Sequence, residues 1–154
     1  MTPHTTNMKQ TLLFVIGCTC LCLIAGCTTP SRHKAVVNPA IEKLNAAREV
    51  ALACIMYADA HGGQYPPNLP ATAGYCKTNI LDQLVANFDL VYSGAVTNIA
   101  NPSATIVLKE KQAWQSLGGS KLLKAYGFAD GHAEIHTSED GNFDKWEDER
   151  IVKP

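Results

Sequence analysis

Residues 38–63 read NPAIEKLNAAREVALACIMYADAHGG, and this stretch carries the signals for the start, body and end of one long helix. Asn38 can accept hydrogen bonds from amides of the first turn, and Pro39 at the first helical position loses no donor that the helix needs. The two glycines that close the stretch supply the left-handed conformation with which many helices end. We therefore predict a helix from Pro39 to about Ala60.

One side of this predicted helix is apolar. Apolar residues recur at spacings of three and four positions, which is the period of a helix that buries one face. The expected buried stripe consists of Ile41, Leu44, Ala47, Ala51, Ile55 and Ala58.

Strand-like runs follow the helix along the rest of the chain. After a short helix predicted over 79–87, residues that favour strands occupy 88–92, 104–110, 124–129 and 132–137. Asp130-Gly131 lies between the last two runs and indicates a hairpin with a two-residue turn. One long helix followed by an antiparallel meander predicts an α+β fold, in which the helix packs on a small sheet. In the tail, 142–148, Phe143 and Trp146 are expected to hold a short amphipathic turn or helix against the body.

The N-terminus has the organisation of an export signal. Lys9 precedes an apolar run, 11–25, of about 15 residues, which is shorter than the ~20 residues that cross a bilayer. The run ends in Leu23-Ile24-Ala25-Gly26-Cys27, where small residues precede a cysteine as in a lipobox. We therefore expect cleavage before Cys27 and acylation of its thiol, with a plain secretory signal or an uncleaved anchor as the alternatives.

This interpretation divides the chain into a signal peptide over 1–26, a polar tether over 27–37 and one globular domain over 38–154. Removal of the signal takes away only Lys9 among the charged residues, which leaves 12 basic and 14 acidic side chains and a net charge of −2. With no basic patch, nucleic acid is not an expected partner. Acyl chains such as palmitate would attach the protein to a membrane of the cell envelope, and Thr28 after the cysteine favours the outer membrane by analogy with enterobacterial sorting.

Three stretches of the domain, taken together, resemble a known family. They are 51–67, in which a tyrosine precedes a glycine turn and an aromatic–proline pair; 101–108, a strand entered through Asn-Pro-Ser; and 126–135, with its Ala-Asp-Gly-His hairpin. This order is similar to the globular part of bacterial type II secretion pseudopilin-like proteins of the prepilin type. The resemblance implies a pilin-like head that acts in structure, assembly or protein contact, linked to type II secretion.

The chain departs from that family at two points. The prepilin leader, a Gly followed by Phe-Thr-Leu-Ile-Glu, is replaced by the lipobox, and Ser120 stands where a family subgroup has a histidine ten positions before the Asp-Gly pair. Since a lipoprotein signal is removed, the mature chain would lack the hydrophobic N-terminal helix that packs in the core of pilin filaments.

Two groups of residues have the chemistry of metal ligands. His132, Glu134 and His136 alternate, so a strand would place them on one face, where they would either bind a transition metal or face solvent. Asp140, Asn142 and Asp144 have the spacing of the first ligands of a calcium loop. Lys145 and Ile151 occupy positions where an EF-hand needs Gly and Glu, so a complete EF-hand is excluded. A looser calcium site remains open, since the major pseudopilins that this chain resembles bind calcium in a C-terminal loop.

Cys54 and Cys76 are the cysteines that remain beside Cys27 after cleavage. In an oxidising compartment such a pair can form a disulfide, and the alternative is two buried free thiols. A Cys–His hydrolase built with His132 is not expected, because no oxyanion motif or nucleophile elbow accompanies it.

The sequence predicts a non-enzymatic, lipid-anchored envelope protein that works with protein partners and without a resident cofactor. The alternative is a small extracytoplasmic metal- or ligand-binding module.

Overall fold

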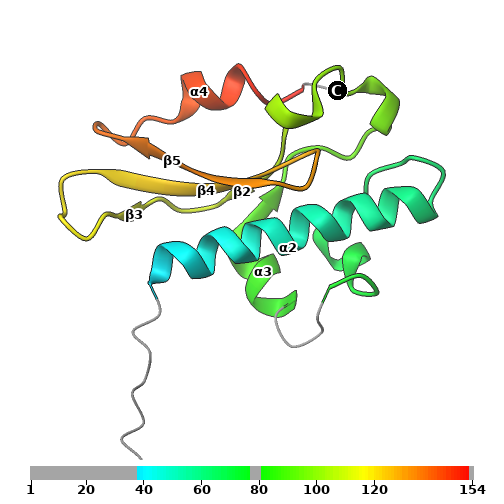
Figure 1. Ribbon diagram of the computed structural model, residues 1–154, viewed down its shortest axis with the longest axis horizontal. Coiled ribbons are helices and arrows are strands. Elements are labelled where there is room, and N and C mark those ends of the chain that lie inside the picture. Colours follow the sequence, from blue (N-terminus) through cyan, green and yellow to red (C-terminus); the bar gives the residue numbers. More distant parts are fainter. Residues whose placement is uncertain (1–37, 77–80, 153–154) are drawn as a thin grey trace, which may run out of the picture. The chain divides into compact units, whose positions relative to one another are not determined.

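The computed structural model describes residues 38–76 and 81–152. The elements, in chain order, are helix α2 (Pro39–Ala60), the 3-10 turn η1 (Leu69–Thr72), helix α3 (Leu81–Asn87), strand β1 (Phe88–Leu90), the 3-10 turns η2 (Val96–Asn98) and η3 (Pro102–Ala104), strands β2 (Ile106–Glu110), β3 (Trp114–Gln115), β4 (Leu122–Phe128) and β5 (Ala133–Ser138), and helix α4 (Asp144–Asp148). The predicted α+β fold is confirmed, since α2 packs against a five-stranded antiparallel sheet (Figure 1).

The ends of α2 are set by the residues that the sequence singles out. The side chain of Asn38 accepts a hydrogen bond from the Ala40 amide at 3.1 Å, and Pro39 is the first helical residue. Gly62 adopts a φ of +66°, and the amide of Gly63 donates to the Ala58 carbonyl at 2.8 Å. These contacts satisfy backbone groups that the helix itself cannot pair.

The sheet is the predicted meander with one additional strand. β2 pairs with β1 and with the end of β4, whereas the two-residue strand β3 pairs with the start of β4. β5 pairs along nearly all of β4, so β2 and β3 share the opposite edge of that strand. A register shift between Ile106 and Leu108 interrupts β2. This irregularity allows Ile106 to face one side of the sheet while Val107 and Leu108 both join the core on the other side.

Small residues bring α2 close to the sheet. A Cβ placed on Gly127 of β4 would lie 3.0 Å from the Ala51 Cβ and 3.1 Å from the Ala47 carbonyl oxygen. Ala47, Ala51 and Ala58 are buried as expected, but Ile41 is 53% exposed, and Val50 and Cys54 belong to the buried face instead. The predicted buried stripe was therefore wrong at Ile41. The close packing of α2 against β4 leaves room only for small side chains, and the first turn of α2 does not contribute to the core.

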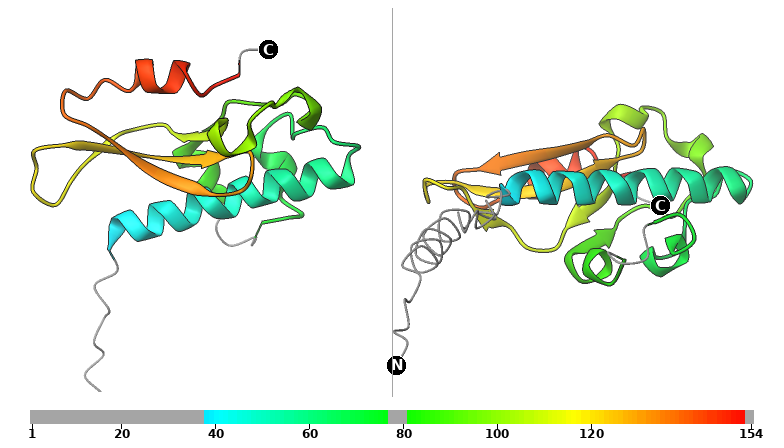
Figure 2. Two further views of the ribbon diagram at one scale, coloured as in Figure 1. Left: turned by 45° about the horizontal axis from the view of Figure 1, so that its top comes forward. Right: turned by 60° about the horizontal axis from the view of Figure 1, so that its bottom comes forward.

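The other face of the sheet is covered by the C-terminal segment. Phe143 is buried together with Ile106, Tyr126 and Phe128, and Trp146 packs against them. The amide of Ile106 also donates to the Arg150 carbonyl at 2.9 Å. Figures 1 and 2 show α2 and α4 on opposite sides of the sheet. The predicted docking of the tail through Phe143 and Trp146 is confirmed.

Candidate functional site

The hairpin between β4 and β5 has a three-residue loop. Phe128 pairs with His132, and the Gly131 amide donates to the Phe128 carbonyl at 2.9 Å. Gly131 has a φ of +88°, but no non-glycine residue in the described part of the chain has a positive φ. The predicted two-residue turn was wrong, since the favoured form needs positive φ at Asp130 as well. Ala129 and Asp130 instead form the turn, and Gly131 adds the left-handed residue that closes it.

The three alternating side chains around β5 do not converge on one point. The ring of His132 stacks on Phe128 with centroids 4.2 Å apart, and its Nδ1 lies 2.5 Å from Asp130 Oδ1. The ring of His136 stacks on Trp146 at 4.1 Å, while Glu134 is exposed. Burial lowers the pKa of His136, and Arg150 adds to this lowering while Glu134 opposes it. His136 is half-buried because its ring stacks on Trp146 of α4, so it does not face open solvent. Metal binding at His132, Glu134 and His136 stays a prediction.

The loop that follows β5 uses its acidic and amide side chains for local structure. Asp140 Oδ1 accepts hydrogen bonds from Ser138 Oγ at 2.7 Å and from the Asn142 amide at 3.0 Å, and these bonds lower the pKa of Asp140. Asn142 Oδ1 accepts from the Asp144 amide at 2.9 Å. Among the residues that the structure describes, no three His, Cys, Asp or Glu side chains form a group that could hold a metal ion. Calcium binding at Asp140, Asn142 and Asp144 stays a prediction.

Cys54 and Cys76 are free thiols that contribute to the same core. Cys54 is fully buried in α2, and burial raises its pKa to about 12, with Cys76 adding to the shift. Burial also raises the pKa of Cys76, although Thr72, with Oγ1 3.6 Å from Sγ, acts in the opposite direction. A thiol with a raised pKa is protonated at neutral pH and is a poor nucleophile. Of the two alternatives, the structure contains the pair of free thiols.

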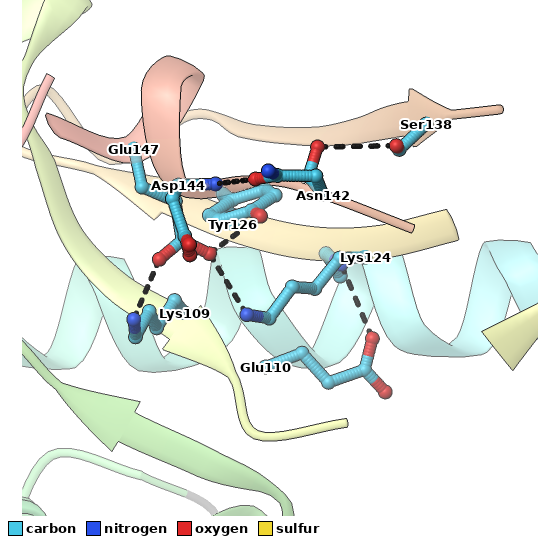
Figure 3. A network of polar contacts seen from close by, with 9 residues as sticks. Lys109, Glu110, Lys124, Tyr126, Ser138, Asn142, Asp144 and Glu147 are labelled. Atoms are coloured by element: carbon cyan, nitrogen blue, oxygen red, sulfur yellow. Dashed lines mark hydrogen bonds and ion pairs between the residues drawn. The ribbon is translucent and has the colours of Figure 1, made fainter. Parts of the chain in front are cut away.

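A buried carboxylate ties α4 to the sheet, and sequence reasoning missed it. Glu147 is 6% exposed. Its two oxygens accept from Lys109 Nζ at 2.6 Å, Lys124 Nζ at 2.8 Å and the Tyr126 hydroxyl at 2.9 Å (Figure 3). The partners lie on two neighbouring strands, β2 and β4, so this one side chain holds the C-terminal segment over the sheet. An acidic residue in an amphipathic tail gives no sequence signal of such burial.

A second buried carboxylate lies at the other side of the sheet. Glu110, at the end of β2, is 3% exposed and forms an ion pair with Lys43 of α2. It also accepts hydrogen bonds from Trp114 Nε1 at 2.9 Å and from the Ala125 amide at 3.1 Å. The ammonium group of Lys43 lies 5.3 Å from the centroid of the Trp114 ring. These contacts link α2 to β2, β3 and β4.

The Lys43–Glu110 pair lies in a surface cleft between α2, α3 and the β2–β3 connection. One lobe of the cleft has a volume of about 470 Å³ and the other of about 260 Å³. Lys43, Asn87 and Glu110 line both lobes, so the two lobes lie side by side. Sequence reasoning placed no site at this cleft. Its lining comes from three separate segments, 42–49, 84–88 and 110–114, so no single stretch of sequence could reveal it.

No protein-family model, curated protein or solved structure matches this chain. Within residues 38–76 and 81–152, no helix has both the length and the apolar character that crossing a bilayer requires. Cys27, the signal peptide and the tether lie outside the described residues.

Proposed function

We propose that this chain is a non-enzymatic, lipid-anchored protein of the bacterial cell envelope, whose pseudopilin-like head works by protein contact in structure or assembly, linked to type II secretion. The lipobox that ends at Cys27 supports the anchor. The order of one long helix and an antiparallel meander supports the head. The described histidines, thiols and buried carboxylates are occupied in packing, stacking or ion pairs, which favours a structural use of these groups over a catalytic one.

The observation that carries the contact role is the outer face of α2, defined by Ile41, Leu52 and Met56. These side chains are 53%, 43% and 51% exposed. Separations of 11 and four residues place them on one side of a helix. Val96 and Leu117 are the other large exposed hydrophobic residues in the described part of the chain. We take these exposed apolar side chains as the candidate contact surface, on which the exposed Asn45 and Arg48 lie between Ile41 and Leu52.

We expect Cys27→Ser to abolish lipidation and to leave an unprocessed precursor, because only this cysteine follows small residues at the end of the apolar run. Metabolic labelling with an alkyne fatty acid measures the lipid, and electrophoretic mobility reports processing. Cys22→Ser is the matched control and should keep the full label. Undiminished label on the Cys27→Ser protein would refute the anchor.

We expect Met56→Glu to remove specific protein partners from the chain extracted from its native membrane, because a carboxylate on the outer face of α2 cannot be buried in an apolar contact without cost. Co-purification with quantitative mass spectrometry measures the partners. Val96→Glu introduces the same charge at an exposed apolar residue of η2 and should leave them unchanged. Partners that survive Met56→Glu would show that this face is not the contact surface.

The alternative function is a small extracytoplasmic metal- or ligand-binding module. The cleft around Lys43 and Glu110 favours the ligand-binding form of this alternative, because concave sites with a few convergent polar groups are the usual places for ligands. The metal-binding form rests on sequence spacing alone, that of Asp140, Asn142 and Asp144 and that of His132, Glu134 and His136.

A further inference from the structure

The cleft between α2 and the β2–β3 connection combines an apolar floor with a polar rim. Ala46, Leu84 and Phe88 provide apolar surface in the larger lobe, and Leu84 and Phe88 also belong to the core, so the floor is fixed. Planar polar groups surround it: the carboxylate of Glu42 and the amides of Asn45 and Asn87. Such groups can donate or accept two hydrogen bonds in one plane.

The smaller lobe adds an aromatic ring and a third amide. Trp114 is half-buried and lines this lobe together with Gln112 of the β2–β3 connection. The hydrogen bond from its indole Nε1 to Glu110 fixes the orientation of the ring. The ring is held in place and only half-buried, and the Lys43 ammonium group lies 5.3 Å from its centroid, so a flat ligand can contact the exposed part of the indole beside this ammonium group.

The charges of the cleft are largely balanced within the protein. The lining contains three carboxylates, from Glu42, Glu49 and Glu110, and two ammonium groups, from Lys43 and Lys111. Glu110 and Lys43 pair with each other, and Glu110 receives two further hydrogen bonds. A ligand therefore meets a preformed ion pair, neutral amides and a small surplus of negative charge from the remaining carboxylates. This surface disfavours phosphates and other anions, because it has no surplus of positive charge.

We propose that this cleft binds a neutral carbohydrate chain. A pyranose ring has hydroxyl groups around its edge and C–H bonds on its faces, so it matches a rim of planar amides, an apolar floor and a tryptophan ring. The two neighbouring lobes share Lys43, Asn87 and Glu110 in their linings, and two adjacent hollows suit several linked sugars better than one small enclosed molecule. The inference is independent of how the chain is anchored and assigns the cleft a role separate from the outer face of α2.

The test is isothermal titration calorimetry of the full chain in detergent with three neutral probes: chitohexaose, cellohexaose and maltohexaose. We expect at least one of them to bind saturably, with an affinity that changes little between low and moderate salt. The Asn45→Ala/Asn87→Ala double variant should bind it at least about tenfold more weakly, because each amide contributes hydrogen bonds to the ligand. Asn98→Ala, an exposed asparagine of η2 outside the cleft, is the matched control and should bind like the wild type.

Both substituted asparagines are exposed, so the double variant is expected to fold, and its circular dichroism spectrum checks this. The proposal is overturned if none of the three oligosaccharides binds, or if the double variant binds as tightly as the wild type. Hexalysine serves as the competing probe. If it binds in a salt-dependent way and loses affinity in the double variant, the cleft takes basic peptides instead. None of these outcomes affects the fatty-acid labelling at Cys27. The proposal of a lipid anchor and the proposal of carbohydrate binding can therefore be refuted independently of each other.

Discussion

Replacement of Glu147 by alanine is expected to lower the free energy of unfolding by about 3–5 kcal/mol, which is the cost of breaking a buried ion pair by removing one partner. The substitution leaves the ammonium groups of Lys109 and Lys124 and the hydroxyl of Tyr126 without their shared acceptor. The side chain of Lys124 is only 12% exposed, so water can replace the lost contact only in part. Urea unfolding followed by circular dichroism measures the change.

The matched control for this change is Glu149→Ala. Glu149 lies directly after α4, is 56% exposed and pairs with its neighbour Arg150. A surface pair of this kind contributes little, so we expect a change within about 0.5 kcal/mol. If Glu147→Ala were as mild as Glu149→Ala, the carboxylate would not hold α4 on the sheet.

The same network predicts a dependence of stability on pH. Burial raises the pKa of Glu147, but the hydrogen bonds from Lys109, Lys124 and Tyr126 outweigh it, and the net shift is downward. A carboxyl group whose pKa is lower in the folded state stabilises the fold above its unfolded pKa of ~4.3 and loses this contribution as the pH falls through the folded pKa. The stability difference between wild type and Glu147→Gln should therefore be largest near neutral pH and shrink in acid. A difference that stays constant from pH 7 to pH 3 would contradict this role.

Replacement of Gly131 by valine is expected to destabilise the protein by about 2–5 kcal/mol, through two separate effects. The φ of +88° places the residue in a region that costs a side chain with a Cβ about 1–2 kcal/mol. A Cβ at this position would also lie 2.7 Å from Leu52 Cδ2 and 3.1 Å from Ile55 Cδ1. Forcing α2 away from the hairpin adds an overpacking cost of about 1–3 kcal/mol. The midpoint of thermal or urea unfolding measures the sum.

Gly119→Val separates the two effects. Gly119 has a φ of +69°, and a Cβ there would meet nothing within 4 Å. Gly119→Val should therefore lower the free energy of unfolding only by the backbone cost of a positive φ, about 1–2 kcal/mol. Equal losses at the two glycines would mean that the contact with Leu52 and Ile55 carries no energy, and an unchanged midpoint for Gly131→Val would argue against the hairpin itself.

The sequence by itself determined the features that depend on neighbours in the chain. The start of α2 follows from Asn38 and Pro39, and its end from Gly62, because a cap satisfies backbone groups only a few residues away. Runs of residues that favour strands placed β4 and β5, and the Asp-Gly pair placed the turn between them. Within that turn, however, the pairing of the strands decided which residue became left-handed, and the result was a three-residue loop.

Only the tertiary structure decided which apolar residues are buried and where the charges pair. Close packing against Gly127 selected Ala47 and Ala51 and left Ile41 in solvent, because the distance between helix and sheet depends on both partners. Glu147 pairs with lysines 38 and 23 positions earlier, and Glu110 pairs with a lysine 67 positions earlier. An isolated Lys or Glu is usually exposed, so each of these buried pairs, and the cleft that forms around Lys43 and Glu110, exists only once the folded backbone brings distant residues together.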